Sequence, residues 1–325
     1  MKAIVIRAPG GPEVLELVER PDPDPSRGEV RVRVRATAVN RADILQRLGG
    51  YPAPRDVPAD IPGLEFAGEI DAVGDGVAEW KSGDRVFGLV GGGAYAERVV
   101  VHARTVSRIP DSMSFIDAAA VPEAFVTAYD AMVVQGRLSA GETALVHAVG
   151  SGVGTAAVQI AKAIGARAIG TARTESKLAQ ARQYGMSDGI VVADARFAEK
   201  IAAIGASIDV VLDLVGGSYV QENIACVASR GRIVLVGLVG GARGDIDFRM
   251  MLQKRVTLKA TVLRSRPLEE KIEAAQLFER HIVPLLRNGV LKPVIDRVLP
   301  LEKAGEAHTY VASNAGFGKV VLSIA

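Results

Sequence analysis

Residues 143–155 read TALVHAVGSGVGT, an uncharged stretch in which an apolar run leads into glycines at alternate positions. Apolar residues then recur with helical periodicity as far as Ile164. A buried strand, a glycine turn and an amphipathic helix are typical of dinucleotide binding, because glycine lets backbone amides approach a pyrophosphate and the helix N-terminus favours anions. The strict G-x-G-x-x-G spacing is not met, since residue 155 is threonine, so a plain tight turn is the alternative. The predicted phosphate-binding residues are Gly150, Ser151, Gly152, Val153 and Gly154.

Apolar runs like this one recur at a regular spacing along the middle of the chain, with helical periodicity between them. The runs are continuous rather than alternating, as expected for strands buried on both faces of a parallel sheet. Repeated strand–helix units of this size predict an α/β fold with a doubly wound parallel sheet over residues 123–262. The predicted strands are 144–148, 168–171, 190–193, 209–215 and 233–236.

The flanking segments have a different rhythm. Residues 1–122 form short β-like segments, and valines alternate with arginines over residues 30–35, the period-2 pattern of a half-buried strand. A helix over 268–287 and a strand over 319–324 follow the central repeats. We infer that the chain returns there to its first domain, which would then comprise residues 1–122 and 263–325.

Composition narrows the class of protein. The chain has 325 residues, 35 of them glycine, and its 39 basic and 37 acidic side chains leave a formal charge of +2. That balance gives no electrostatic argument for nucleic-acid binding, which needs a basic surplus. The single cysteine, Cys226, excludes a disulfide framework and any multi-cysteine zinc site and indicates a reducing compartment. No signal peptide or membrane span is evident, so we expect a cytoplasmic protein without a membrane partner.

The choice of cofactor depends on the second strand of the repeat. Sites that prefer NAD place an acidic residue about 20 residues beyond the glycine turn, on the ribose 2′-hydroxyl. Here the strand ends in Arg173, and Lys177 lies one helical turn further on, which favours a 2′-phosphate and therefore NADPH over NADH. Glu175 is the dissenting residue; its alternative place is the first turn of the following helix, where the helix dipole stabilises an acid.

Several further motifs carry a family resemblance over essentially the whole length. With the glycine turn, they resemble the medium-chain dehydrogenase/reductase superfamily, in its zinc-free NADPH:quinone oxidoreductase branch. Residues 263–266, together with Gln46 and Tyr51, look most like the p53-inducible quinone oxidoreductase type. The motifs are NRAD at 40–43, PGLEFAG at 62–68, GDRV at 83–86, PEAFVTA at 122–128 and GKVVL at 318–322.

The resemblance implies a GroES-like β-barrel catalytic domain over 1–122 and 263–325, beside a Rossmann cofactor-binding domain over 123–262. The cofactor would lie in the cleft between them. Members of this branch are commonly homodimers that pair through the last strands of the cofactor domain, here residues 256–262. Besides a second copy of the chain, the expected binding partner is a small-molecule quinone or enone substrate.

The resemblance also bears on metal chemistry. Zinc-dependent alcohol dehydrogenases of this superfamily have cysteine where this chain has Asn40, and histidine where it has Leu64. Catalytic zinc needs about three Cys, His or carboxylate ligands. The four histidines show no metal-ligand spacing, so we expect hydride transfer without a metal.

Three residues are candidates for catalysis. Tyr51 resembles the tyrosine that related enoyl reductases use as an acid or a substrate anchor; the alternative is a loop aromatic that covers the nicotinamide. Asn40 could bind a substrate carbonyl or the nicotinamide ribose, or cap the helix that follows it. Thr127 matches a position beside the nicotinamide ribose, against a structural role inside a helix. Asp43 is expected to be structural and to fix Asn40.

Further cofactor contacts follow from position. Leu214, Val236, Gly237 and Leu238 end the fourth and fifth predicted strands, at the edge where ligands bind in open α/β sheets. The resemblance adds Leu263, Arg264, Ser265 and Asn314 on the nicotinamide side and in the cofactor cleft.

The chain is therefore predicted to be an NADPH-dependent, metal-free reductase of quinones or quinone-like conjugated carbonyls. One alternative is an NADPH-dependent enoyl or enone reductase that acts on a C=C bond with the same residues. The other is an NADPH-binding protein with little catalysis. His147, His308 and Cys226 are expected to be structural, the last as a buried small hydrophobe.

Overall fold

Six parallel strands in the order β10-β9-β8-β11-β12-β13 form the sheet of the second half of the chain. The chain starts at the centre with β8, moves out to β10, and then returns to the other side of β8 with β11. This order confirms the predicted doubly wound parallel sheet. The strands are β8 (Thr143–Val146), β9 (Arg167–Ala172), β10 (Asp188–Val191), β11 (Ile208–Asp213), β12 (Val227–Leu235) and β13 (Thr257–Ala260).

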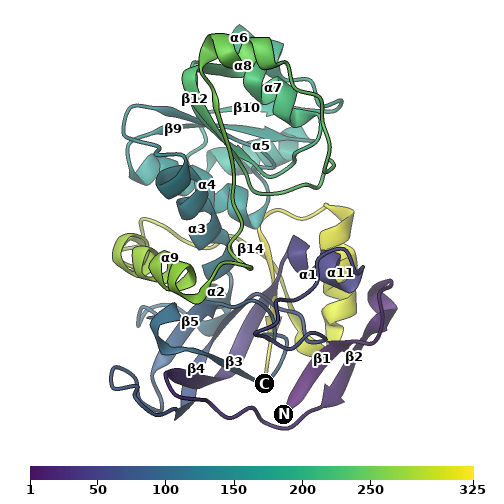
Figure 1. The fold of residues 1–325 in the computed structure, drawn as a ribbon, viewed down its shortest axis with the longest axis vertical. Coiled ribbons are helices and arrows are strands. Elements are labelled where there is room, and N and C mark those ends of the chain that lie inside the picture. The colour runs from purple at the N-terminus through teal and green to yellow at the C-terminus, as the bar shows by residue number, and fades with distance from the viewer. The chain divides into compact units, whose positions relative to one another are not determined.

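Helices cover this sheet and bury its strands (Figure 1). The first helix of the repeat packs on β8 and β9, and the helix after β11 packs on β11 and β12. Leu145, Ile169, Val211 and Ile233 are completely buried, each on a different strand, as continuous apolar runs predict. The helical elements are α4 (Gly152–Ala163), α5 (Glu175–Arg182), α6 (Ala198–Ala203), α7 (Tyr219–Cys226), α8 (Phe248–Lys254) and the π-helical η3 (Asp130–Gln135).

Four of the five strands predicted for this sheet extend one or two residues too far at their carboxyl ends, because β8, β10, β11 and β12 end at Val146, Val191, Asp213 and Leu235. The prediction for 144–148 is wrong at residues 147 and 148, because the backbone turns at Ala148, whose φ is +49°. The prediction for 209–215 is wrong beyond Asp213, because the Asp213 carboxylate accepts the N–H groups of Val215 and Gly216 and folds the chain into a turn. Both endings depend on the conformation of the turn and not on hydrophobicity.

A second sheet, of seven strands, belongs to the rest of the chain. Its order is β14-β15-β3-β4-β5-β7, and β6 also pairs with β3. The last strand, β15, pairs antiparallel with β3, so a strand from the end of the chain belongs to the same sheet as strands from its first third. The strands are β3 (Glu29–Val39), β4 (Glu65–Val73), β5 (Arg85–Leu89), β6 (Arg98–His102), β7 (Val106–Arg108), β14 (Ile295–Pro300) and β15 (Lys319–Ser323); β1 (Lys2–Ile6) and β2 (Leu15–Glu19) form a separate pair.

The alternation along β3 has the predicted consequence. Val30, Val32 and Val34 are buried in the core, while Arg31 and Arg35 point away from it. Arg31 pairs with Asp71 at 2.7 Å, and Arg35 with Glu69 at 2.9 Å. The sheet is accompanied by α1 (Arg41–Arg47), α2 (Phe115–Ala119), α9 (Leu268–His281), α10 (Val283–Arg287), α11 (Ala304–Ser313) and the short 3₁₀ turns η1 (Pro12–Val14), η2 (Ala103–Thr105) and η4 (Leu301–Lys303).

The predicted helix over 268–287 is wrong as a single helix, because the chain breaks at Ile282 between α9 and α10. Pro284 lies in the first turn of α10. A proline there is tolerated, whereas inside a continuous helix its ring would clash with the carbonyl four residues back.

The computed structural model describes all 325 residues and divides into two compact units. We call residues 1–126 with 263–325 the β unit, and residues 127–262 the sheet unit. The boundary lies within α3 (Pro122–Tyr129), whereas the sequence suggested a boundary after residue 122. No helix is both long enough and apolar enough to cross a membrane.

Candidate active site

The glycine turn of the sheet unit joins β8 to α4. Ser151 caps the helix, and its hydroxyl accepts the N–H of Gly154 at 3.0 Å. A Cβ at residue 154 would lie 2.6 Å from the Ala148 carbonyl oxygen, so only glycine lets the helix start this close to the turn. The amides of Gly152 and Val153 lie in the first helical turn, where no helix carbonyl can accept them. This arrangement fits a pyrophosphate group.

The residues predicted to choose the cofactor follow β9. Arg173 comes directly after the strand and is exposed, and Lys177 lies in α5. Glu175 is the first residue of α5, as its alternative placement predicted, and its carboxylate accepts a hydrogen bond from Arg182 at 2.9 Å. The acidic group is therefore engaged along its own helix.

The carboxyl ends of β11 and β12 meet around Asp213, which is completely buried. Its carboxylate accepts the N–H groups of Val215 and Gly216 at 2.8 and 2.9 Å, and its carbonyl accepts those of Val236 and Gly237 at 2.8 and 3.3 Å. The structure thus brings Leu214, which lies between these turns, together with Val236, Gly237 and the exposed Leu238. Sequence reasoning named the strand ends but missed Asp213, although an acid at the end of a buried strand was a visible signal.

A buried polar chain continues from Asp213 to the glycine turn. Asn223 donates its amide N–H to Asp213 at 2.9 Å, so its oxygen faces His147 Nε2, at 2.7 Å. That oxygen can only accept, so Nε2 carries the proton and Nδ1 accepts the Thr171 hydroxyl at 2.9 Å. Burial lowers the pKa of His147, which keeps the ring neutral. The expectation of a satisfied, buried histidine is confirmed.

Tyr219, at the start of α7, is a further residue that sequence reasoning missed. Its ring lies 4.8 Å from that of His147 and 5.0 Å from that of Phe197. Burial raises the pKa of Tyr219 most and the Asp213 charge raises it further, while the Arg173 charge opposes the rise. Tyr219 therefore lies within electrostatic reach of the cation predicted to bind the cofactor.

In the β unit, Asn40 precedes α1 at the N-cap position, and its backbone N–H donates to Asp43 at 2.8 Å. Its side-chain amide points elsewhere: Nδ2 donates to Glu65 Oε1 at 2.8 Å and to the Ala38 carbonyl at 3.3 Å, and Oδ1 accepts Lys319 Nζ at 2.5 Å. The nitrogen and the oxygen of this amide are therefore both hydrogen-bonded within the β unit.

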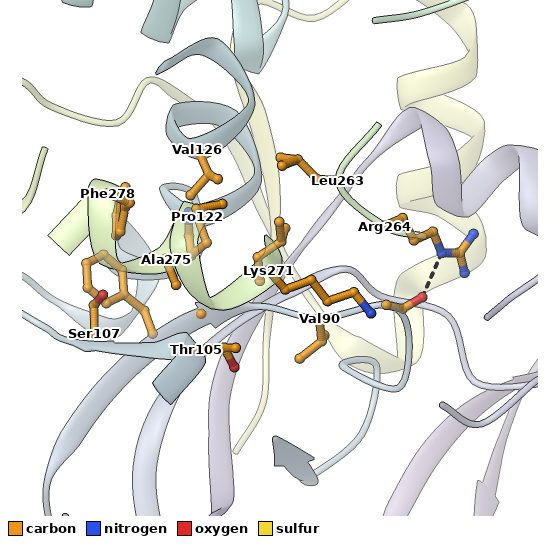
Figure 2. A pocket seen from close by; sticks show the side chains of 15 residues that line it. Val90, Thr105, Ser107, Pro122, Val126, Leu263, Arg264, Lys271, Ala275 and Phe278 are labelled. Atoms are coloured by element: carbon orange, nitrogen blue, oxygen red, sulfur yellow. Dashed lines mark hydrogen bonds between the residues drawn. The ribbon is translucent and has the colours of Figure 1, made fainter. Parts of the chain in front are cut away.

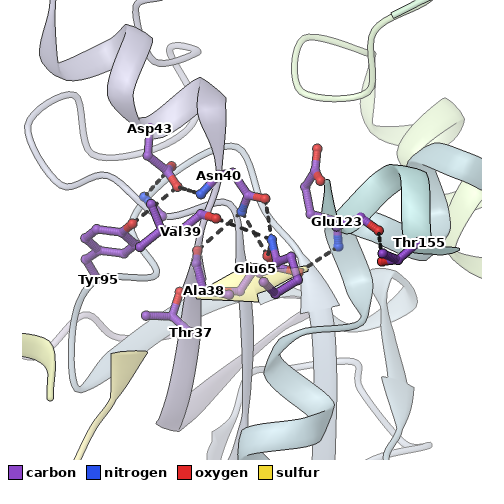
Figure 3. Close-up of polar contacts among 12 residues, drawn as sticks. Thr37, Ala38, Val39, Asn40, Asp43, Glu65, Tyr95, Glu123 and Thr155 are labelled. Carbon is purple, nitrogen blue, oxygen red and sulfur yellow. Dashed lines mark hydrogen bonds and ion pairs between the residues drawn. The ribbon is translucent and has the colours of Figure 1, made fainter. Parts of the chain in front are cut away.

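Glu65 and Lys319 form a buried ion pair (Figure 3). Lys319 Nζ lies 2.6 Å from Glu65 Oε1, and the two side chains are 5% and 0% exposed. The second carboxylate oxygen of Glu65 accepts the backbone N–H of Glu123 at 2.8 Å, in the first turn of α3. The pair thus joins β4, β15, the end of β3 and the start of α3. Both residues stood in motifs quoted for the family resemblance, but nothing in the sequence indicated their contact.

The residues at this point do not fit a zinc ion. Asn40 and Leu64 are the positions at which the family resemblance places zinc ligands, but an amide and an aliphatic chain do not bind zinc, and the Lys319 ammonium already neutralises Glu65. No group of three His, Cys, Asp or Glu side chains in the chain could hold a metal.

Asp43 is the centre of a second buried network. Its carboxylate accepts the backbone N–H groups of Asn40 and Gly63 and, at 3.3 Å, the Tyr95 hydroxyl. Tyr95 in turn lies 3.1 Å from His308 Nε2. Burial raises the pKa of Asp43 to about 6 and lowers that of His308 to about 3. Asp43 and His308 are structural, as expected.

Tyr51 is half-buried in the loop after α1 and is held by Arg264. Arg264 donates to the Tyr51 carbonyl at 3.1 Å, and its guanidinium carbon lies 4.8 Å from the centre of the Tyr51 ring. Burial raises the pKa of Tyr51, and the positive charge of Arg264 opposes that rise. Of the neighbouring predicted residues, Leu263 is half-buried and Ser265 is exposed.

A pocket of the β unit opens beside Arg264 (Figure 2). Its empty space, counted together with solvent at its mouth, is about 510 Å³. The wall is mostly apolar, with Phe87, Val90, Leu263 and Phe278 among its residues, and Arg264 and Lys271 supply its cations. The pocket is therefore an apolar recess with positive charge at its wall.

The remaining predicted residues fall into both units. Asn314 ends α11 in a left-handed conformation, and its side-chain oxygen accepts a hydrogen bond from Arg41. Thr127 is buried in α3, at the first residue of the sheet unit. The predicted site thus consists of a phosphate-binding part in the sheet unit and an acceptor part in the β unit. Cys226 ends α7, and burial raises the pKa of its thiol to about 12, so it is unreactive.

Comparison with known proteins gives a consistent picture. Residues 26–111 match the alcohol dehydrogenase GroES-like domain, and residues 152–280 match the zinc-binding dehydrogenase family. The chain is 33% identical to the quinone oxidoreductase of Homo sapiens, over 99% of this chain and 97% of that protein. It is also 37% identical to a polyketide synthase of Streptomyces halstedii over 89% of this chain, which spans 5% of that synthase.

Solved structures agree with the sequence matches. The Escherichia coli quinone oxidoreductase complexed with NADPH has a TM-score of 0.89 and 30% identity, with full coverage of both chains. A structure described as an NAD-dependent alcohol dehydrogenase has a TM-score of 0.87 and 33% identity, again with full coverage. The similarity therefore extends over both units.

Removing one member of the buried ion pair should be costly. Glu65→Leu or Lys319→Met alone should lower the free energy of unfolding by about 3–5 kcal/mol, because each leaves an uncompensated buried charge. The double variant should lose clearly less than the sum. Urea unfolding of all three variants measures this coupling. The exposed pair Lys303–Glu306, 3.5 Å apart, is the control, and Lys303→Met should cost less than about 1 kcal/mol. Strict additivity at Glu65 and Lys319 would contradict the assignment.

Proposed function

Because the chain belongs to the medium-chain dehydrogenase/reductase family, in its quinone oxidoreductase branch, we propose that it reduces quinones or quinone-like conjugated carbonyls with NADPH and without a metal. The observation that carries this proposal is the Lys319–Glu65–Asn40 contact at the position of the zinc ligands of other members. An acceptor that delocalises its developing negative charge does not need a Lewis acid. Conjugated carbonyls and quinones have this property.

The sheet unit supports NADPH as the cofactor. The glycine turn can hold the pyrophosphate, and Arg173 and Lys177 would bind the 2′-phosphate while Glu175 is engaged with Arg182. The Escherichia coli relative was solved with NADPH, whereas another similar structure carries NAD in its description. When bound, NADPH would supply the hydride.

The β unit supports a role for Tyr51 as the proton donor. Burial raises the pKa of its phenol, which is thus protonated at neutral pH, and Arg264, which contacts Tyr51, also lines the neighbouring apolar pocket. Asn40 uses its amide on Glu65 and Lys319, which favours a positioning role over a hydrogen bond to the acceptor. We propose that Thr127, Leu263, Ser265 and Asn314 contact the nicotinamide half of the cofactor, as the family resemblance implies.

A second candidate is an NADPH-dependent enone or enoyl reductase. It is favoured by the match to a segment of a polyketide synthase, since the growing chain on such a synthase is an acyl chain. The same residues would serve, because hydride addition to a C=C bond beside a carbonyl also leaves an enolate oxygen to be protonated. A binding protein with little catalysis is the third candidate.

An acceptor screen separates these functions. We expect NADPH oxidation with 1,4-benzoquinone and 9,10-phenanthrenequinone, and slower oxidation with 2-alkenals and crotonyl-CoA, followed at 340 nm. Tyr51→Phe should lower kcat about 10²-fold or more if the phenol donates the proton. Alkene reduction without quinone turnover would establish the second candidate instead. Tight NADPH binding with no turnover of any acceptor would establish the third.

The cofactor assignment has its own prediction. Arg173→Ala combined with Lys177→Ala should weaken NADPH binding by about 1.5–3 kcal/mol for each lost charge-assisted hydrogen bond, and should change NADH binding little. Cofactor fluorescence titration measures both affinities. Arg167→Ala, at the opposite end of β9, is the control and should affect neither. An equal loss for NADPH and NADH would contradict a 2′-phosphate site.

We also propose that the protein is a cytoplasmic homodimer paired through β13. This strand is the unpartnered edge of the six-stranded sheet, and Phe248 and Leu252 of the preceding helix are 68% and 77% exposed. Light scattering should give twice the chain mass of 34.1 kDa. Phe248→Asp with Leu252→Asp should shift the protein to the monomer, and Val298→Asp, on β14 of the other sheet, should not. A wild-type monomer at micromolar concentration would refute the proposal.

A further inference from the structure

Arg264 is a buried cation whose hydrogen-bond partners are all neutral. The residue is 6% exposed. Its Nε donates to the Gly91 carbonyl at 2.6 Å (Figure 2). One terminal nitrogen donates to the Tyr51 carbonyl at 3.1 Å, and the other donates to the side-chain oxygen of Gln46. These acceptors belong to three separate segments: α1, the loop after it, and the loop after β5. A single side chain therefore fixes the relative positions of all three.

No carboxylate is bonded to this guanidinium. Burial lowers the pKa of Arg264 and the charge of Asp43 opposes this, but the oxygens of Asp43 accept hydrogen bonds from Asn40, Gly63 and Tyr95. Lys271, the other cation of the pocket, pairs with Asp56 at 3.1 Å. The positive charge of Arg264 is thus not cancelled by direct pairing at the pocket wall.

Burying a charge in this way disfavours folding, and an apolar side chain of similar size would often be as stable or more so. The retained charge therefore points to a use at the pocket. The guanidinium lies over the ring of Tyr51, whose centre is 4.8 Å from the guanidinium carbon, and its charge acts on the Tyr51 phenol.

We propose that Arg264 is the positioning residue for Tyr51: it fixes the loop that carries the phenol, and its charge stabilises the phenolate left after proton donation. This inference rests on the proposed reductase function. Hydride transfer adds two electrons and one hydrogen to the quinone and gives the hydroquinone monoanion. Tyr51 gives its proton to that oxygen, and water then reprotonates the phenolate.

Two charged groups act on the Tyr51 phenol in opposite directions. Arg264 favours the phenolate, and Glu123 at the start of α3 disfavours it. Removal of the Arg264 charge should therefore raise the pKa of Tyr51. The ionisation that ends the activity of an acid catalyst on the alkaline side should then move to higher pH, because the phenol stays protonated longer.

Two variants separate charge from geometry. Arg264→Met removes the charge and keeps much of the side-chain length, while Arg264→Lys keeps the charge and loses the planar fork. The phenol titration of Tyr51 is read in the free protein from the ultraviolet difference between each variant and the same variant carrying Tyr51→Phe. This readout needs neither cofactor nor acceptor.

We expect Arg264→Met to move the Tyr51 titration upward by about one pH unit and to lower kcat at least tenfold. Arg264→Lys should restore the titration to near its wild-type position but should keep a raised KM for the quinone, because the loop is less well fixed. Arg85→Met is the matched control, since Arg85 also lies over an aromatic ring, that of Phe115, and donates to backbone carbonyls. Arg85→Met should change neither the Tyr51 titration nor kcat.

An unchanged Tyr51 titration in Arg264→Met would overturn the proposal. So would equal losses in Arg264→Met and Arg264→Lys that appear only as a lower thermal midpoint. If Arg264→Met does not fold, Arg264→Gln takes its place, because it also removes the charge but keeps a polar group that can donate a hydrogen bond. The Tyr51 titration should then rise as well, whereas Gln46→Leu, which keeps the Arg264 charge, should leave the titration in place and raise KM. A shifted titration in a protein that turns over no acceptor would refute the proposed function and leave the coupling of Arg264 to Tyr51 standing.

Discussion

The buried pair of Lys319 and Glu65 is the contact on which the β unit depends. Lys319 lies six residues before the end of the chain, and Glu65 opens β4. Because the carboxylate also accepts Asn40 Nδ2 and the Glu123 N–H, one buried charge fixes the end of β3, the final strand and the start of α3. Apolar packing alone would hold these segments together without fixing their polar groups. A buried carboxylate tolerates few arrangements of its donors, and this imposes a defined geometry on the segment that leads to Tyr51.

The pattern of apolar residues was sufficient to predict five of the six strands of the sheet unit, whereas β13 was expected from the family resemblance alone. Its strands are buried on both faces, so each appears in the sequence as a continuous run, and the glycine turn identifies the first of them. The ends of the strands could not be read in the same way. His147 and Ala148 continue the apolar run but belong to a turn, since only the three-dimensional structure reveals the left-handed backbone of Ala148. The break between α9 and α10 was different, because Pro284 is a local signal that the sequence displays.

Those parts of the candidate site that depend on local backbone conformation could be predicted from the sequence. The parts that depend on contacts between side chains distant in the chain could not. Gly154 indicates a close approach of helix and turn, and Glu175 indicates the first turn of a helix. A charged residue, by contrast, does not reveal its partner. The contacts of Asp213 with a turn and of Arg264 with three loops join positions far apart in the chain, and they depend on how the strands and loops are arranged. The sequence identified which types of residue the site contains, while the structure shows which of these residues contact one another.

The hydrogen-bond chain through Tyr95 has a consequence for acid tolerance. Asp43 holds its proton up to about pH 6 in the folded protein, so between its ordinary value near 4 and pH 6 it makes folding less favourable as the pH rises. His308 releases its proton only near pH 3, so over the same interval it makes folding more favourable as the pH rises. The two groups with these opposite effects both contact the hydroxyl of Tyr95. Through mildly acidic solution they offset each other, so that this buried polar network, despite its two strongly perturbed groups, leaves the stability of the β unit nearly indifferent to protons.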